Sequence, residues 1–293
     1  MGAADVVPGV SGGTIAFISG IYDELINSLK SFDRESLKLL FNLKFRSLWK
    51  KINGTFLLAV FSGILISIFS LARLLEYLMG SYPVFIWSFF FGLILASAII
   101  ILRKINKWGW KNILALIFGT AVMFVISTFS PAETTEAYWF IFISGAIAVC
   151  AMILPGISGA FILLILGKYQ FILGAVSSFD IPVLIIFGSG VITGLISFAN
   201  LLSWLLGNYR DTTISVLAGF LIGSLNKIWP WKENISTRIS SDGHIVPLVQ
   251  KNIFPGEYLS VTGEDPYLLH ASVLILIGIF LVLVLERLVK KPV

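Results

Sequence analysis

Cysteine, histidine and charged side chains are all scarce in this chain of 293 residues. The single cysteine, Cys150, excludes an internal disulfide and a cysteine-cluster metal site. The two histidines, His244 and His270, are too few and too far apart for an obvious metal cage. Charged residues make up 13% of the chain, whereas a soluble globular domain carries about 25%. The composition therefore argues against a soluble domain and leaves no sign of a bound metal or cofactor.

Apolar residues are abundant instead, at 57% of the chain with a mean hydropathy of +0.94. Near-continuous apolar runs cover residues 56–71, 84–102, 112–129, 181–206 and 271–285. Several of them approach or exceed the ~20 residues that cross a ~30 Å hydrocarbon core as a helix. Many of the eight tryptophans lie near the ends of these runs, as in an interfacial aromatic belt. The sequence predicts an all-α polytopic membrane protein.

One motif occurs twice. Residues 6–22 read VVPGVSGGTIAFISGIY, and residues 153–169 read ILPGISGAFILLILGKY. A shift that places Pro8 on Pro155 also aligns the following Gly and Ser residues, and the similarity continues beyond the motif at a second, shorter shift. A matched series of Pro, Gly, Ser and Tyr is not expected by chance. The chain therefore divides into two homologous halves, residues 1–129 and 138–293, within one integral membrane domain.

Basic residues predict which ends of the helices face the cytoplasm. They concentrate in residues 30–51, in residues 103–111 and at the C-terminus, which the positive-inside rule places in the cytoplasm. Residues 130–137 carry only acids and residues 230–266 carry a net negative charge, so both are expected outside. The C-terminus is therefore predicted to be cytoplasmic.

The predicted sides of these segments determine how many times the chain crosses the membrane. The predicted spans are residues 54–78, 83–102, 112–129, 181–206, 212–229 and 267–287. Residues 138–167 must then begin and end outside, as a re-entrant hairpin, and residues 1–20 must do the same from the cytoplasmic side. Each half becomes a re-entrant broken-helix hairpin plus three transmembrane helices, and the odd number of crossings inverts the second half, as in many secondary transporters. The alternative is that each motif is a kinked full span.

The residues of each motif explain a helix break. Proline lacks an N–H and disfavours helix at the preceding residue, while glycine permits the turn; the predicted breaks are Pro8, Gly9, Pro155 and Gly156. Ser11 and Ser158 are suitable N-caps for half-helices that start near the bilayer midplane. Free N–H groups at such N-termini can hold an anion. The alternative is that the glycines only permit close helix packing.

These considerations give a set of candidate residues. The predicted phosphate-binding residues are Ser11, Gly12, Gly13, Thr14, Ser158, Gly159, Ala160 and Arg73. Arginine suits a phosphate because its planar fork binds two oxygens. Asp5, Glu76 and the repeat counterpart Asn200 are candidates for a second layer or for coupling to H⁺ or Na⁺. The alternatives are a snorkelling Arg73 paired with Glu76, and a solvent-facing Asp5 at a helix end.

Two polar segments outside the motifs have open roles. Residues 28–53 place leucines, a phenylalanine and a tryptophan among lysines, so this amphipathic stretch lies on the inner leaflet or serves only as a cytoplasmic topology anchor. Residues 230–266 form an outer loop with the length of a lid, and nothing in their sequence names a ligand.

The first motif, GAADVVPGVSGGTIAFISGIYDELI, closely resembles the signature of the bacterial polyprenyl-phosphate transporter (PopT) family, and LPGISGAFILLILGKY resembles that family's internal repeat. The resemblance covers nearly the whole chain. It implies that the chain returns undecaprenyl phosphate from the outer to the inner leaflet of the bacterial cytoplasmic membrane, for reuse in cell-envelope synthesis. In one departure, the first motif lacks the ten or so apolar residues that precede the second, so we expect the chain to lack part of its first half-helix through truncation or disorder.

Two other functions remain open from the residues alone. A helix-dipole site would also suit a secondary transporter or channel for a small soluble anion. A membrane enzyme acting on a lipid phosphate would need a nucleophile, a base or a metal cluster, and no such constellation is visible. The expected partners are undecaprenyl phosphate and membrane lipids, without nucleic acid, and the sequence does not indicate an oligomeric state. Transport by alternating access is the expected mechanism.

Overall fold

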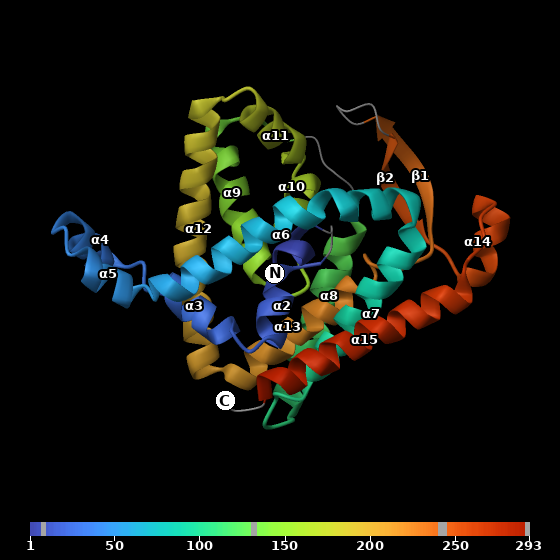
Figure 1. The fold of residues 1–293 in the computed structure, drawn as a ribbon, viewed down its shortest axis with the longest axis horizontal. Coiled ribbons are helices and arrows are strands. Elements are labelled where there is room, and N and C mark those ends of the chain that lie inside the picture. The colour runs from blue at the N-terminus through green and yellow to red at the C-terminus, as the bar shows by residue number, and fades with distance from the viewer. Residues whose placement is uncertain (7–9, 130–133, 240–244, 291–293) are drawn as a thin grey trace.

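The computed structural model describes residues 1–6, 10–129, 134–239 and 245–290, and helices dominate this part of the chain (Figure 1). The first half contains α1 (Gly2–Val6), α2 (Gly12–Ile18), α3 (Tyr22–Lys30), α4 (Arg34–Phe41), α5 (Phe45–Lys51), α6 (Gly54–Ser81), α7 (Pro83–Leu102) and α8 (Trp110–Thr128). The second half contains α9 (Tyr138–Ile153), α10 (Gly159–Ile165), α11 (Tyr169–Ser177), α12 (Ile181–Asn208), α13 (Arg210–Ser224), β1 (Lys232–Ile239), β2 (Ile245–Asn252), α14 (Pro255–Thr262) and α15 (Leu268–Lys290).

Five of the described helices are long and apolar enough to cross a membrane, namely α6, α7, α8, α12 and α15. They confirm the polytopic helical membrane protein that the apolar runs predict. The span predicted at residues 212–229 is wrong in length, because α13 is a helix of 15 residues that continues only as turns to Ile228. A helix of that length falls short of the ~20 residues that cross the hydrocarbon core.

Burial separates one central span from the others. In α7, 61% of the span is buried, whereas the other four candidate spans are 11% to 22% buried. Their exposed faces carry large apolar side chains such as Phe69 of α6 and Phe280 of α15. Exposed apolar surface on this scale suits a lipid solvent rather than water. The main buried core of the described residues therefore forms around α7, together with α2, α3 and α13.

Helices from the two halves pack against one another. The spans α7 and α15 pack side by side, as do α8 and α13, and each pair joins the two halves. Glycines permit the close approach, since a Cβ on Gly92 would overlap the carbonyl oxygen of Ile275 and a Cβ on Gly219 would overlap that of Leu116. Small residues are the usual means by which helix backbones approach closely in membranes.

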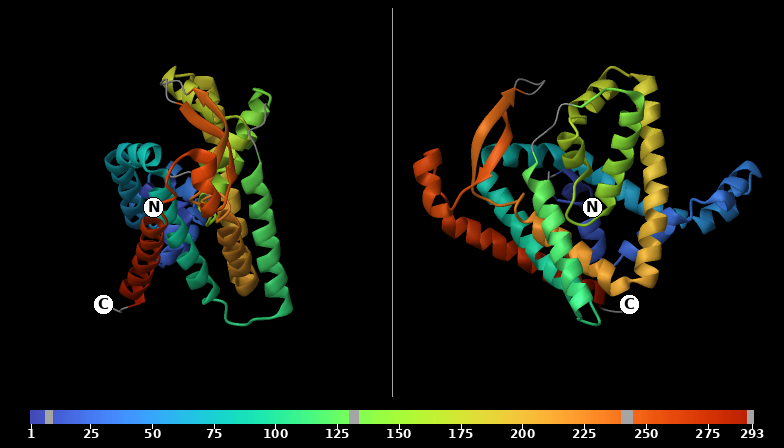
Figure 2. Two further views of the ribbon diagram at one scale, coloured as in Figure 1. Left: turned by 90° about the vertical axis from the view of Figure 1, so that its right-hand side faces the viewer. Right: turned by 180° about the vertical axis from the view of Figure 1, so that it is seen from behind.

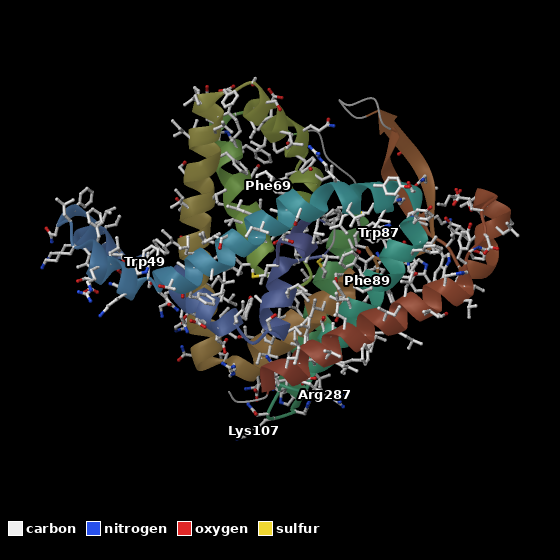
Figure 3. All side chains as sticks on the ribbon, viewed as in Figure 1. Trp49, Phe69, Trp87, Phe89, Lys107 and Arg287 are labelled. Carbon is white, nitrogen blue, oxygen red and sulfur yellow. The ribbon has the colours of Figure 1, made fainter. Side chains whose placement is uncertain are left out.

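The two ends of the molecule differ in charge. The α7–α8 loop, the α12–α13 turn and the C-terminal end of α15 lie together at the lower end in Figure 1, and both views in Figure 2 agree. Asp211 fastens two of these segments, because its carboxylate accepts hydrogen bonds from the N–H groups of Asn106 and Lys107 at 3.2 and 3.0 Å. Figure 3 shows Lys107 and Arg287 at this end. Two of the three basic segments that the positive-inside rule groups together are therefore neighbours in space, whereas residues 30–51 lie in and around α4 and α5, at the left of Figure 1.

The opposite end carries a feature that the sequence did not predict. Within residues 230–266, β1 and β2 form an antiparallel hairpin with an irregularity at Ser236, followed by the short helix α14. Trp231 attaches the hairpin to the helices, because its indole N–H donates to the carbonyl oxygen of Pro266 at 2.9 Å and its side chain is buried. Most of the fold is helical, but β1 and β2 of this segment are not.

The stretch between α3 and α6 projects from the body as a pair of helices, α4 and α5, at the left of Figure 1. Lys51 closes this pair through ion pairs with Asp33 and Glu35, and the Lys51–Asp33 distance is 2.8 Å. Large apolar side chains such as Phe41 and Trp49 are exposed on it. The arm has the amphipathic character that its sequence predicts, with no apolar partner within the described chain.

Candidate functional site

In both motifs, one helix ends and a second helix begins. The chain leaves α1 at Val6 and enters α2 at Gly12, and it leaves α9 at Ile153 and enters α10 at Gly159. Gly156 has a φ of +85°, a left-handed conformation that favours glycine. Pro8 and Gly9 lie outside the described residues. Past the break, α10 returns toward the end at which α9 begins, and it meets α11 at an angle of 107° (Figure 1).

The two breaks lie against each other, although they are far apart in sequence. The Ser11 hydroxyl has the carbonyl oxygens of Leu154 and Met152 within donating distance, at 2.9 and 3.1 Å. In return, the Thr14 hydroxyl oxygen accepts a hydrogen bond from the N–H of Gly156 at 3.1 Å. Ser11 and Thr14 are fully buried. Ser11 and Thr14 of the first motif are therefore bonded to the break of the second motif.

The first motif supplies hydrogen-bond acceptors to the N–H groups at the N-terminus of α2. Ser11 acts as the predicted N-cap and accepts from the N–H of Gly13 at 3.0 Å. The Asp5 carboxylate accepts from the N–H of Gly12 at 2.7 Å, and the carbonyl oxygen of Ser11 accepts from Thr14. Asp5 therefore occupies the position that an external anion would take at α2. Its second oxygen, Oδ2, is buried and has no hydrogen-bond partner among the described residues.

The second motif leaves the corresponding groups free. Ser158 has the extended backbone of an N-cap, but its side chain makes no capping hydrogen bond. Within the described ranges, the N–H groups of Gly159, Ala160 and Phe161 have no hydrogen-bond acceptor. The repeat counterpart of Asp5 is Met152, which cannot accept from them. Free amide donors are therefore a property of α10 and not of α2.

At three glycines of the motifs, other atoms occupy the space that a side chain would need. A Cβ on Gly12 would overlap the Asp5 carboxylate, and one on Gly13 would overlap the carbonyl oxygen of Ile153. A Cβ on Gly159 would lie 2.7 Å from the carbonyl oxygen of Ala148. Close packing accounts for these three glycines: Gly13 meets the other motif, whereas Gly12 and Gly159 meet atoms of their own half. A ligand would have to meet the amide edges of the helix rather than these faces.

The predicted charged residues of the spans are not part of this crossing. Arg73 is exposed on α6, and it makes no ion pair or hydrogen bond with any residue that the structure describes. The side chain of Glu76 lies outside the described set, so the predicted pairing of Arg73 with Glu76 stays a prediction. Asn200 is exposed and donates to the carbonyl oxygen of Ile196 in its own helix at 2.8 Å.

The sequence did not predict a role for two lysines that follow α13, of which Lys227 contacts the second motif. The Lys227 ammonium lies 4.6 Å from the ring centre of Phe161, in the first turn of α10. The Lys232 ammonium lies 3.9 Å from the ring centre of Trp87 and donates to the carbonyl oxygen of Lys227 at 2.6 Å. Burial, together with the nearby charge of Lys227, holds the pKa of Lys232 well below its usual range. The sequence signal for this pair is the position of Lys227, near the end of the span predicted at residues 212–229 and close to Trp229 and Trp231.

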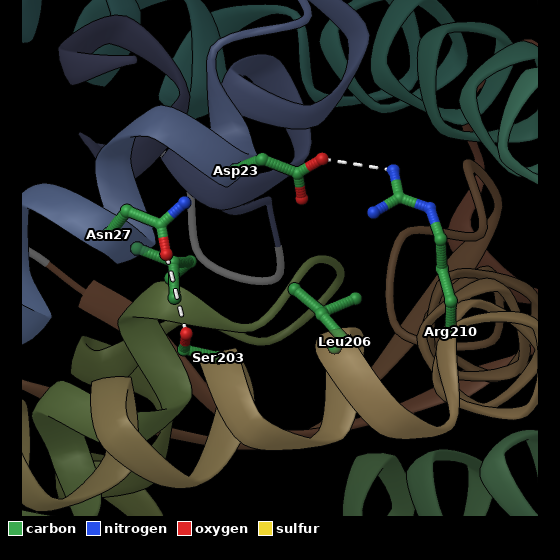
Figure 4. Close-up of a pocket in the computed structure, with 7 residues that line it drawn as sticks. Asp23, Asn27, Ser203, Leu206 and Arg210 are labelled. Atoms are coloured by element: carbon green, nitrogen blue, oxygen red, sulfur yellow. Dashed lines mark hydrogen bonds and ion pairs between the residues drawn. The ribbon is translucent and has the colours of Figure 1, made fainter.

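A polar pocket of about 240 Å³ lies where α3 of the first half meets α12 and α13 of the second (Figure 4). Its lining residues are Asp23, Ile26, Asn27, Ser203, Leu206, Gly207 and Arg210. Arg210 pairs with Asp23 at 2.9 Å, and the Ser203 hydroxyl donates to the side-chain oxygen of Asn27 at 3.3 Å. Lys30 donates to the Ser203 hydroxyl oxygen at 3.2 Å. Polar side chains thus hold the two halves together at this end.

Comparison with known proteins gives a consistent result. A family model described as undecaprenyl phosphate translocase-like (VCA0040-like) matches residues 1–246. A polyprenyl-phosphate transporter of Vibrio cholerae serotype O1 is 48% identical over 291 residues, which cover 99% of this chain and 94% of that protein. A polyprenyl-phosphate transporter of Staphylococcus aureus is 32% identical over 248 residues, or 78% of this chain and 83% of that protein. No solved structure matches the chain.

Proposed function

Since the chain belongs to the undecaprenyl phosphate translocase-like family, we propose that it carries undecaprenyl phosphate from the outer to the inner leaflet of the bacterial cytoplasmic membrane. The lipid carrier would thereby be recycled for cell-envelope synthesis. Both relatives are named as transporters of polyprenyl phosphate, and this chain has the apolar helices of a multi-pass membrane protein. The proposed activity is transport without covalent change of the lipid.

The free amides of α10 at the crossing of the two motifs are the observation that carries this proposal. A phosphate that leaves water loses several kcal/mol of hydration unless new donors replace the water. The N–H groups of Gly159 and Ala160 have no acceptor among the described residues, and Ser158 stands beside them with an uncommitted hydroxyl. Ser11 and Thr14 would position this site by bonding to the second motif, and the isoprenoid tail would stay in lipid.

The inverted repeat gives the proposed route. In this arrangement, each half is a re-entrant hairpin plus three helices, and the C-terminus is cytoplasmic. The position of the α7–α8 loop beside the C-terminal end of α15 and the return of α10 toward the end where α9 begins support it. So does the pairing of α7 with α15 and of α8 with α13, because a twofold relation that exchanges the halves converts one pair into the other.

Alternating access would close the two ends in turn. At the end that we assign to the cytoplasm, α3 packs against α12 through the polar contacts of Figure 4. In the repeat, α11 corresponds to α3 and α6 corresponds to α12. The helices α11 and α6 do not pack extensively against each other. The difference supports a state that is closed inward and open outward. Asp5 is the residue that we propose to carry a coupling H⁺ or Na⁺, because its Oδ2 is buried without a partner in the described chain.

Transport into vesicles tests the proposal. The full chain would be reconstituted in liposomes that hold a fluorescent undecaprenyl phosphate analogue in one leaflet, and its appearance in the other leaflet would be followed. We expect faster movement than in protein-free liposomes, and a loss of at least tenfold in Ser11→Ala combined with Thr14→Val. The matched control replaces the exposed Ser177 and Thr193, which bond only to their own helices. Movement of inorganic phosphate without movement of the lipid would instead establish the soluble-anion alternative.

A further inference from the structure

Two ammonium groups that lie on aromatic rings, those of the buried Lys232 and the half-buried Lys227, stand outside the residues that the repeat singles out, and Lys227 contacts the second motif. Lys232 is 9% exposed and Lys227 is also largely shielded from solvent. Both follow α13 along the chain, and each places its ammonium on an aromatic face, Phe161 for Lys227 and Trp87 for Lys232. Figure 3 shows where Trp87 lies on α7. The pair therefore connects α13, the central span α7 and the first turn of α10.

Neither ammonium is neutralised by the part of the chain that the structure describes. None of the ion pairs found there involves Lys227 or Lys232. Lys232 donates one hydrogen bond, to the Lys227 carbonyl, and the Lys227 ammonium has no hydrogen-bond acceptor within that part. A buried cation without a carboxylate is costly, and an aromatic face compensates only part of that cost. Such a group has unused capacity for an anion.

The position of Phe161, the aromatic partner of Lys227, indicates where an anion would bind. Phe161 belongs to the second motif, where its repeat counterpart is Thr14 of the first. Gly156 of the same motif lies against α13, since a Cβ on it would stand 3.0 Å from the carbonyl oxygen of Phe220. Lys227 follows α13 directly and reaches Phe161 from that side. An anion approaching the second motif from the side of the β1–β2 hairpin would meet this ammonium.

We propose that Lys227 and Lys232 form a receiving site for the phosphate monoester of the substrate, on the outer side of the motif crossing. The inference deepens the proposed function and rests on it. Phosphate oxygens would take donors from both ammonium groups while the Phe161 and Trp87 rings hold the lysine stems in place. The pair would draw the headgroup out of the outer leaflet and pass it to the second motif. Arg73, exposed on α6, is not needed for this step.

A binding experiment on the purified full chain in detergent tests the pair. The probes are farnesyl phosphate, farnesol with the same tail but no phosphate, and inorganic phosphate. We expect Lys227→Gln to bind farnesyl phosphate roughly tenfold to a hundredfold more weakly, which is the range for lost hydrogen bonds to a charged group. Lys227→Arg keeps the charge and should retain most of the affinity. Lys251→Gln, an exposed lysine on β2, is the matched control and should bind as the wild type does.

The outcomes separate this inference from the function on which it rests. If the wild type binds farnesyl phosphate and both Lys227→Gln and Lys232→Gln bind it equally well, the receiving site is overturned and the proposed function stands. If the wild type does not discriminate farnesyl phosphate from farnesol, or binds inorganic phosphate as tightly, the lipid-phosphate function and the receiving site both fall. Should Lys227→Gln unfold, Lys227→Met keeps the apolar stem on Phe161 and removes only the charge, and the same comparison applies.

Discussion

The two motifs have similar sequences, but they differ in the hydrogen bonding of the N–H groups at the N-termini of α2 and α10. At α2, a carboxylate, a serine hydroxyl and a backbone carbonyl accept the first three N–H groups. At α10, the corresponding N–H groups have no acceptor in the described chain. The first motif is thus completed by the protein itself, whereas the second remains available to another molecule. A repeated motif therefore need not mean a repeated site.

Two substitutions between the halves explain the difference. Asp5 corresponds to Met152, so only the first half supplies a carboxylate to its own half-helix. Thr14 corresponds to Phe161, so the first half supplies a hydroxyl that bonds across to Gly156, while the second supplies a ring on which Lys227 rests. We infer that the first motif positions and the second binds. The following predictions test that division of roles, from the largest expected effect to the smallest.

Gly156→Ala should have the largest effect. Its φ of +85° would cost an alanine about 1–2 kcal/mol, and the new Cβ would also press on the carbonyl oxygen of Phe220 at 3.0 Å. We expect a clear drop in the thermal unfolding midpoint and a transport rate at least tenfold lower. Gly174→Ala is the control, because Gly174 is helical with no atom near its Cβ position, and it should be neutral or slightly stabilising. Equal behaviour of the two variants would remove the special role of the second break.

Met152→Asp should give the second motif a carboxylate at the position that Asp5 occupies in the first. The Met152 Cβ lies 3.4 Å from the Cβ position of Gly159, so a carboxylate there could accept from the free N–H groups of α10. We expect affinity for farnesyl phosphate to fall roughly tenfold or more, because the new charge would both fill the donors and repel the phosphate. Met152→Asn tests the charge separately. Undiminished affinity in the aspartate variant would contradict the binding role of the second motif.

Thr14→Val should weaken the bond between the motifs without adding charge. The variant leaves the buried N–H of Gly156 without its acceptor, for an expected loss of about 1–3 kcal/mol of unfolding free energy. Chemical denaturation in detergent would measure it. The control is Thr193→Val, since Thr193 is exposed and bonds only to its own helix. A change no larger than that of the control would mean that the crossing does not depend on this bond.

Arg210→Gln should have the smallest effect. The Arg210 and Asp23 side chains are 50% and 49% exposed, and an exposed ion pair typically contributes about 0–1 kcal/mol. If the contact is an inner closure, its loss should shift the conformational balance more than the stability. A double-mutant cycle with Asp23→Asn, read by transport rate and by unfolding, separates these effects. Strict additivity of the two variants in transport would argue against a closure.

Sequence patterns located most of this architecture. The span predicted at residues 83–102 is α7 to the residue, and the predicted helix breaks fall between α1 and α2 and between α9 and α10. Hydropathy and Pro-Gly chemistry are local properties, so one sequence suffices to find them. The β1–β2 hairpin was missed because β1 is polar, β2 contains a proline, and the hairpin depends on anchoring through side chains such as Trp231.

The candidate site was harder to predict because it depends on contacts between distant segments. Ser11 and Thr14 were selected as ligands to a phosphate, and the structure instead uses them to bond the second motif. Lys227 was not selected, because a lysine at the end of a span is usually a topology signal, and only the fold brings it to Phe161. Spacing within a motif cannot reveal such a partner.

The exchange of helices between the halves has a consequence for biosynthesis. When α7 and α8 leave the ribosome, the helices that cover them, α15 and α13, have not yet been made. The first half must therefore wait in the bilayer with two unfinished surfaces, and the last helix to emerge completes the first half rather than its own. A chain cut between the halves should give two unstable fragments when they are produced separately and a working protein when they are produced together.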